Sequence, residues 1–283
     1  MNDKPKNRPI YAPQPLAGGS YHVWNQAIWY PPYVVLYRPN VPFIKNNLGV
    51  EEIKDPDDIA DNPQPLYETN EERATRRAKK AIRDYAICNE FDMFVTFTFK
   101  ADRDDIPKCI SKMHNWMKNQ NKRTGSFGYL IVMEYHSDGV NVHFHALLKG
   151  YKGKVTPAIN PKTGKHVIQN GRQCYSLPSY TSGFTTMTYV ETDPLSRLKT
   201  AAYLGKYITK DMPVFANKNR YWASKGLAKP IREDNPARWY LDLELTPDDI
   251  YEGDYGTFEV YKGLTYDMVK HYNSPIREEQ ERE

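Results

Sequence analysis

Two apolar segments joined by a tight turn, residues 127–136 and 141–150, place the strongest constraint on how this chain can fold. Each is typical of a strand, and Asp138-Gly139 between them is a strong hairpin signal. A two-residue turn sets position 137 opposite 140, and therefore Glu134 opposite His143 and position 132 opposite His145. Because side chains on one face recur at every second residue, the sequence predicts Glu134, His143 and His145 together on one face of a sheet.

An acid beside two imidazoles is a three-ligand set that leaves coordination positions open for water and substrate. Such a set suits Mn²⁺ or Mg²⁺ activation of a phosphate, and Zn²⁺ as well. A His-x-His pair alone is equally compatible with packing. Glu134 favours the metal site, because a buried acid without a partner is costly and calls for a cation or hydrogen-bond donors nearby. His136 shares the parity of Glu134 and is an alternative ligand, although its place at the turn favours exposure.

The remaining periodicities predict an α+β fold. They indicate helices at about 71–88, with Asn70 as N-cap, at about 106–124, and at 196–211, with Ser196 as a plausible cap; strands are indicated at 93–100 and 183–191. The order strand, helix, strand, strand, strand, helix fits a mainly antiparallel sheet with helices packed on it.

The chain divides by composition into three parts. Residues 1–69 are rich in Pro, Tyr and Asn without a sustained period, which predicts an irregular N-terminal arm. Its aromatics Trp24, Trp29, Tyr30, Tyr33 and Tyr37 could stack on bases, although pinning the arm to the body is the favoured interpretation. We expect the main domain at 70–240, with an insertion at 151–182 that holds its own small hairpin near 160–173. Residues 241–283 form a C-terminal extension with an acidic tail.

Bulk properties narrow the class of protein only slightly. A formal charge of +4 is compatible with a polyanionic partner. No apolar run is long enough to span a bilayer and the N-terminus lacks the apolar stretch of a secretory signal, so we expect a cytoplasmic protein with no membrane partner. Three widely spaced cysteines indicate reduced thiols rather than a disulfide framework or zinc cluster.

A second chemical motif lies in the predicted helix at 196–211. Tyr203 and Tyr207 are four residues apart, as are Lys206 and Lys210, which places all four along one side of a helix. A phenol with a pKa of about 10 is a poor nucleophile unless an ammonium or a metal favours the phenolate. The alternative is an amphipathic helix whose tyrosines face the core and whose lysines reach solvent.

These motifs, in their order along the chain, resemble those of HUH endonucleases, the rolling-circle replication initiators (Rep proteins) of single-stranded DNA phages and plasmids. The resemblance rests on FVTFTF at 94–99, on Glu134 with His143 and His145, and on YxxKYxxK at 203–210, and it covers about 71–230. The doubled tyrosine is most similar to the two-tyrosine type of microviruses and filamentous-phage-like elements. The segment 220–230 also resembles the one that follows the tyrosine helix in phage initiators. Its Arg220 and Lys225 are candidate DNA contacts, with simple surface charge as the alternative. No Walker A sequence is present, and the insertion and the arm depart from the family pattern.

The resemblance implies an RRM-like or ferredoxin-like five-stranded antiparallel sheet, and nicking and joining of single-stranded origin DNA in the cytoplasm of a bacterial host. Glu134, His143 and His145 would hold Mn²⁺ or Mg²⁺; Tyr203 would attack first and Tyr207 second, through a 5′-phosphotyrosine, with Lys206 and Lys210 balancing charge. A replicative helicase or polymerase of the host is the expected protein partner. The alternatives are a transposase or relaxase of the same superfamily, a zinc hydrolase, and a non-enzymatic RRM-like binder that stacks bases on Phe97, Phe99 and the arm aromatics.

Overall fold

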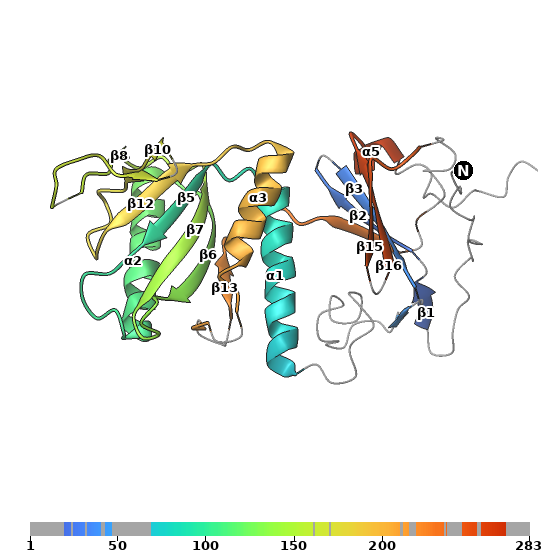
Figure 1. The fold of residues 1–283 in the computed structure, drawn as a ribbon, viewed down its shortest axis with the longest axis horizontal. Helices are drawn as coiled ribbons and strands as arrows, with labels where there is room; N and C mark the ends of the chain where they lie inside the picture. Colours follow the sequence, from blue (N-terminus) through green and yellow to red (C-terminus); the bar gives the residue numbers. More distant parts are fainter. Residues whose placement is uncertain are drawn as a thin grey trace, which may run out of the picture. The chain divides into compact units, whose positions relative to one another are not determined.

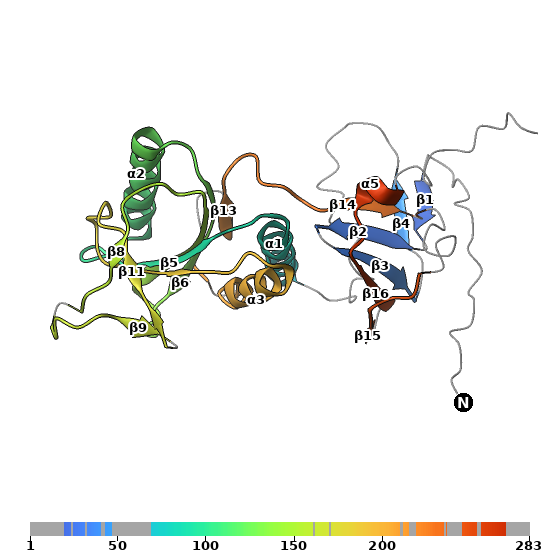
Figure 2. The same cartoon turned by 90° about the horizontal axis from the view of Figure 1, so that it is seen from above.

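The protein consists of two compact units, one formed by both ends of the chain and one by its middle. The structure, a computed structural model, describes residues 20–23, 25–31, 33–40, 43–46, 69–160, 162–169, 171–209, 212–214, 219–234, 236, 245–253 and 256–269. The middle unit spans Thr69–Lys229, and the other combines Met1–Glu68 with Pro230–Glu283 (Figures 1 and 2). In the described part of the chain, no helix has the length and apolar character needed to cross a membrane.

The middle unit is built on one antiparallel sheet. Its strands are β5 (Met93–Phe97), β6 (Gly128–Tyr135), β7 (Val142–Lys149), β8 (Thr156–Pro157), β11 (Tyr175–Ser176), β12 (Thr185–Tyr189) and β13 (Tyr221–Ala223), in the order β13-β6-β7-β5-β12-β11-β8. Its helices are α1 (Asn70–Cys88), α2 (Ile106–Thr124) and α3 (Pro194–Gly205). The predicted α+β fold is confirmed. The sheet has seven strands rather than five, because the insertion adds the short strands β11 and β8 at one edge.

The two faces of this sheet have different functions. Helix α2 covers one face and the pair α1 and α3 covers the other (Figures 1 and 2). On the α2 face, Phe97, Met133 and Phe144 pack with Met113 and Trp116 in the main hydrophobic core. Burying each such side chain contributes about 1.5–3 kcal/mol. Alternation along the same strands directs the polar residues of β6 and β7 to the opposite face, towards α3.

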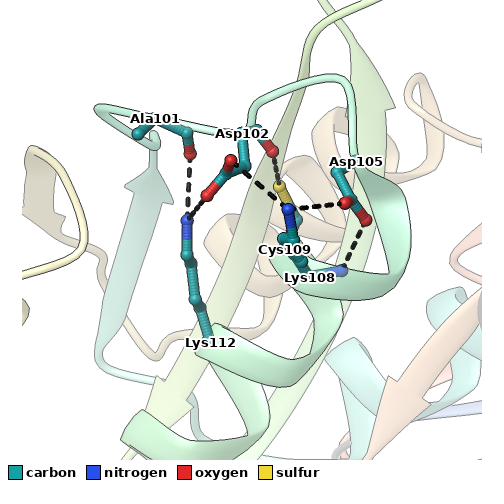
Figure 3. Close-up of polar contacts among 6 residues, drawn as sticks. All are labelled: Ala101, Asp102, Asp105, Lys108, Cys109 and Lys112. Carbon is teal, nitrogen blue, oxygen red and sulfur yellow. Dashed lines mark hydrogen bonds and ion pairs between the residues drawn. The ribbon is translucent and has the colours of Figure 1, made fainter.

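The loop that leads from β5 into α2 is closed by its own polar contacts (Figure 3). Asp102 lies at φ +55°, a conformation that L residues rarely adopt. The Lys112 ammonium donates to the Ala101 carbonyl (3.0 Å) and to the Asp102 carboxylate (2.9 Å). The Cys109 thiol donates to the Asp102 carbonyl, and Asp105 caps α2 by accepting from the Lys108 amide. Burial raises the pKa of the Cys109 thiol to about 11, and all three cysteines are free, as expected.

Helix α1 begins one residue from the predicted cap. Thr69, rather than Asn70, is the N-cap, and it forms a capping box with Glu72 in which each side chain accepts from the other residue's amide. The predicted acidic first turn is confirmed, because Glu71 and Glu72 both lie in it.

Helix α3 begins earlier and ends earlier than predicted. The Asp193 carboxylate accepts from the Ser196 amide at 3.1 Å, so Asp193 is the capping residue instead of Ser196. The helix ends at Gly205, and the amides of Lys206 and Tyr207 then donate to carbonyls three residues back, at 3.2 Å each. Such bonds tighten the last turn. Tyr203 therefore lies on α3, whereas Tyr207 lies in the turn that follows it.

Helix α3 is tied to α1 by one buried cation. The guanidinium of Arg197 donates to the Ile87 carbonyl at 2.9 Å. Ile87 is in the last turn of α1, where carbonyls lack helical partners and a positive charge is favourable. This contact anchors the start of the tyrosine helix against its neighbour.

The other unit corrects the expectation of an irregular arm. It contains β1 (Ser20–Val23) paired with β4 (Phe43–Asn46), and a five-stranded antiparallel sheet made of β14 (Ile231–Asp234), β2 (Gln26–Tyr30), β3 (Tyr33–Pro39), β16 (Gly256–Lys262) and β15 (Asp249–Gly253), followed by α5 (Tyr266–Val269). All five residues of β2 are buried, which removes the alternation by which a strand is recognised. The unit therefore includes residues from 230 onwards, whereas composition predicts that the main domain ends at 240.

The aromatic residues of the N-terminal segment form part of a core of this unit's own. Trp29, Tyr30, Tyr33 and Tyr37 are all buried. Trp29 packs with Leu36 and Tyr261, which comes from the C-terminal segment. Neither base stacking nor attachment to the middle unit is needed to explain these four residues, and Trp24 lies outside the described residues.

The β6–β7 hairpin has the predicted register. Glu134 pairs with His143, and Val132 pairs with His145. In the turn, the Asp138 carboxylate accepts from the Val140 and Asn141 amides at 3.0 and 2.9 Å and from the Asn141 side chain at 2.6 Å. The Asn141 side chain, followed by the two amides, lowers the pKa of Asp138 to about 2.

We expect Asp138→Ala to lower the melting temperature, because it removes these three contacts from the turn. The lowered pKa means that the ionised carboxylate stabilises the fold above about pH 4, its unfolded value, and that this contribution is lost as the pH falls to about 2. The difference in melting temperature between the two proteins, followed by circular dichroism, should therefore shrink on acidification. Asp104→Ala, at another exposed aspartate, is the control, and a difference that is constant with pH would contradict the assignment.

Candidate functional site

Glu134, His143 and His145 converge on one point of the sheet face that α3 covers. The Oε2 atom of Glu134 lies 2.8 Å from Nε2 of His143 and 2.9 Å from Nε2 of His145. The two Nε2 atoms are themselves 2.9 Å apart. All three donor atoms lie within 4.8 Å of one another, and no other such group of His, Cys, Asp or Glu occurs among the described residues. The three residues are a candidate metal centre.

The protonation states of these side chains suit a divalent cation. Burial, followed by the charges of His145 and His136, lowers the pKa of His143 to about 4, so this imidazole is neutral at physiological pH. Burial raises the pKa of Glu134, but hydrogen bonding to His145 and the charges of both imidazoles outweigh it and lower the pKa overall. A neutral imidazole and an ionised carboxylate are the forms that bind metals. Two imidazole nitrogens and one carboxylate oxygen turned towards one another therefore fit Mn²⁺, Mg²⁺ or Zn²⁺.

Thr96 on β5 orients one of the two imidazoles. It is paired with His145 across the sheet, and its hydroxyl lies 3.1 Å from the Nδ1 atom of His145. A hydrogen bond at Nδ1 leaves Nε2 free to bind a metal and holds the ring in place. Thr96 belongs to the segment FVTFTF, whose sequence alone did not assign it a role, because the β5–β7 register is not set by a short turn.

His136 is more enclosed than its place at the turn suggested. It is half-buried, and its ring lies 4.3 Å from that of His143, centroid to centroid. Neither Nε2 of His136 nor Nδ1 of His143 has a hydrogen-bond partner among the described residues. Its nitrogens do not join the converging group, so His136 supports the His143 ring by packing.

Both tyrosines of the doubled motif reach this face of the sheet. The ring of Tyr207 is stacked on His145, with centroids 3.7 Å apart and planes inclined by 13°. Tyr203 lies edge-on to Tyr207 at 5.5 Å and to Phe94 at 5.2 Å. Tyr203 is 45% exposed, whereas Tyr207 is half-buried. The structure thus brings together two motifs that are about 60 residues apart in the sequence.

The lysines and phenols differ in their surroundings. Burial, the hydrogen bond with Tyr203 and the charge of Glu134 raise the pKa of Tyr207 well above the usual value of a phenol. The ammonium of Lys206 is 5.5 Å from the centre of the Tyr203 ring. Lys210 lies outside the described residues.

The two candidate DNA contacts after the tyrosine segment occupy different environments. Arg220 is buried, and its guanidinium donates to the Thr209 carbonyl at 2.7 Å, which ties the end of the tyrosine segment to the start of β13. Lys225 is exposed. The structure therefore accounts for Arg220 by an internal contact and leaves Lys225 accessible to a ligand.

Comparison with known proteins supports a role in replication. Residues 92–212 match a family model of replication-associated proteins of the ORF2 type. The matched range runs from the start of β5 to just beyond α3, and contains Glu134, His143, His145 and both tyrosines. A replication initiator is the class of protein that this match supports. No curated protein and no solved structure matches the chain.

We expect Thr96→Val to weaken Mn²⁺ binding about tenfold or more, because the His145 ring loses the contact that orients it. Isothermal titration calorimetry with Mn²⁺ measures the effect. Thr186→Val changes the position paired with Thr96 on β12 and serves as a matched control. Equal Mn²⁺ affinities for the two variants would show that Thr96 does not position a ligand.

Proposed function

We propose that this protein is a metal-dependent DNA endonuclease and strand transferase of the HUH superfamily, two-tyrosine type. It nicks and rejoins single-stranded DNA at a replication origin to begin and end rolling-circle replication. The observation that carries the proposal is the stacking of Tyr207 on His145, which places the tyrosine motif against the candidate metal ligands. The replication-associated family match over the same residues supports it.

Each member of the proposed site has one role. Glu134, His143 and His145 would hold Mn²⁺ or Mg²⁺, which when bound would polarise the scissile phosphate and offset its developing charge. Thr96 holds His145 in the orientation that presents Nε2 to this position. His136 and Phe94 pack against the imidazoles and keep them in place.

The tyrosines are the proposed nucleophiles. Tyr203 is our choice for the first attack, since it is the more exposed phenol and has the Lys206 ammonium beside its ring. Its oxygen bonds to phosphorus while the bond from phosphorus to the 3′ oxygen breaks. The phenol proton is lost, the departing oxygen gains one, and the products are a 5′-phosphotyrosine and a free 3′-OH that primes synthesis. The energy of the phosphodiester is conserved in the new ester, so rejoining needs no ATP.

Tyr207 is the proposed second nucleophile. Its raised pKa disfavours the phenolate while the Glu134 charge is unbalanced, which suits a group that acts only after the first step. An attack by Tyr207 on the regenerated origin would leave Tyr203 free to take part in rejoining the displaced strand. Lys210 would balance charge in the same way as Lys206.

The DNA and protein contacts follow from the same geometry. Lys225, exposed just after β13, is the proposed phosphate contact, whereas Arg220 is proposed to hold the tyrosine segment in place. A replicative helicase or polymerase of the host would extend the primer. A relaxase or transposase of the same superfamily would use the same residues and would differ in its products, circles in one case and inserted strands in the other.

The structure disfavours a simple RRM-like binding protein. Such a protein stacks bases on exposed aromatic residues of its sheet. Phe97 and Phe99 are 0% and 3% exposed and face the α2 core, so neither can stack on a base. A zinc hydrolase would use the same three ligands, but it would transfer the phosphate to water and leave no DNA attached to the protein.

We expect the double variant Tyr203→Phe/Tyr207→Phe to lose the covalent DNA adduct, because no phenol oxygen remains near the ligands, and to keep its DNA affinity. The measurement uses an origin-like single strand labelled at the 5′ phosphate side of the nick, incubated with Mn²⁺ and separated by denaturing electrophoresis. Tyr189→Phe, at an exposed tyrosine elsewhere on the sheet, is the matched control. An adduct that persists in the double variant would remove the tyrosine assignment.

We expect His143→Ala and a chelator to have the same effect on the unsubstituted tyrosines. Each should reduce adduct formation, since the phosphate loses the charge that polarises it. His114→Ala, on the exposed surface of α2, tests whether loss of any histidine suffices. Cleavage that is unchanged in chelator and in His143→Ala would contradict a metal-dependent reaction.

A further inference from the structure

The insertion between β7 and β12 has a charge pattern unlike the rest of the chain. From position 139 to position 190 there are six Lys and Arg residues and no Asp or Glu. The whole chain has 39 basic and 35 acidic residues, so this segment alone carries more positive charge than the net +4 of the protein. An acid-free stretch of this length creates a local positive field.

The insertion is an ordered structure. Strands β9 (Ile168–Gln169) and β10 (Arg172–Gln173) pair in antiparallel fashion, and Ile159 forms a bridge with His166. The turn before them is closed by Asn160, whose side chain accepts from the Lys162 amide at 2.9 Å. The predicted hairpin near 160–173 is thus present, as a narrow two-stranded ribbon that lies at the β8 edge of the unit, away from α1 (Figures 1 and 2).

The basic side chains of this ribbon and its base are exposed. They are Lys152, Lys154, Lys162, Lys165 and Arg172. Arg172 lies 3.7 Å from Glu191, and the structure gives the four lysines no ion pair within the described residues. The cationic groups on α1 differ, since Arg73, Arg76 and Lys80 all make contacts. The ribbon therefore presents cations whose charge is not neutralised within the described part of the protein.

The residue types of the ribbon distinguish between two forms of nucleic acid. Proteins that bind single strands stack bases on aromatic side chains. Residues 157–174 contain no Phe, Tyr or Trp. Lysines contact phosphates without reading sequence, and a two-stranded ribbon is of a size that the major groove of a duplex admits. Ile168, 62% exposed on β9, adds an apolar group of the kind that contacts thymine methyl groups.

We propose that the β9–β10 ribbon, residues 158–174, is a binding surface for the backbone of double-stranded DNA. That this duplex flanks the nick site rests on the proposed function, whereas duplex binding itself does not. In the sheet order, β8 is four strands from β7, which is about 19 Å at the usual strand spacing. One turn of DNA is about 34 Å long, so a single molecule can reach from the candidate metal centre to the ribbon.

The test compares two pairs of lysines in the full-length protein. Lys162→Gln/Lys165→Gln removes two charges from the ribbon, and Lys118→Gln/Lys122→Gln removes two exposed charges from α2. Fluorescence anisotropy measures binding of each protein to a labelled duplex of about 30 base pairs and to one of its single strands, over a series of salt concentrations. Circular dichroism establishes that both variants are folded.

We expect the ribbon variant to bind the duplex more weakly, and the slope of log affinity against log salt to fall by about 1.8, or about 0.9 for each phosphate that is no longer neutralised. Its affinity for the single strand should be unchanged. A variant that loses duplex binding in a protein that forms no DNA adduct would support the ribbon and reject the nuclease. An unchanged slope, an equal loss in the α2 pair, or an equal loss for the single strand would overturn the proposal; the first would direct attention to an acidic protein partner.

Discussion

The pairing of β6 with β7 in a single register is the constraint on which the candidate site depends. One residue of slip would move Glu134, or the two histidines, to the α2 face and separate the three donor atoms. The Asp138 carboxylate prevents this slip by holding the amides of Val140 and Asn141 in the turn. The hydrophobic residues of the other face act in the same direction, since Met133 and Phe144 are buried only in the observed register.

A second condition concerns the tyrosines, which are brought to the ligands by the ends of α3 rather than by its length. Asp193 determines where the helix starts, and Arg197 anchors its first turns to the end of α1. After Gly205 the chain tightens, which turns Tyr207 flat against His145 while Tyr203 stays on the helix and remains exposed. Two tyrosines four residues apart thus acquire different environments, which is the physical basis for giving them different roles.

Several features were not accessible from pattern alone. Thr96 and Phe94 belong to the site because β5 lies beside β7, a pairing between segments about 50 residues apart that no short turn specifies. The unit formed by both ends of the chain was missed for a related reason. Its strands β3 and β16 pair across more than 200 residues, and β2 is buried on both faces and shows no alternation. The buried place of Arg220 likewise depends on a contact with Thr209 that spacing does not reveal.

The sequence by itself determined the three ligands, their register and the α+β order of the middle unit, because these follow from local rules: a two-residue turn and side chains that alternate along a strand. It also determined that two tyrosines recur on one stretch of chain. Only the tertiary structure decided that these tyrosines meet the ligands, that Thr96 orients His145, and that the two ends of the chain share a sheet. Those arrangements depend on contacts between distant segments, whose energies come from burial and packing that neither segment encodes alone.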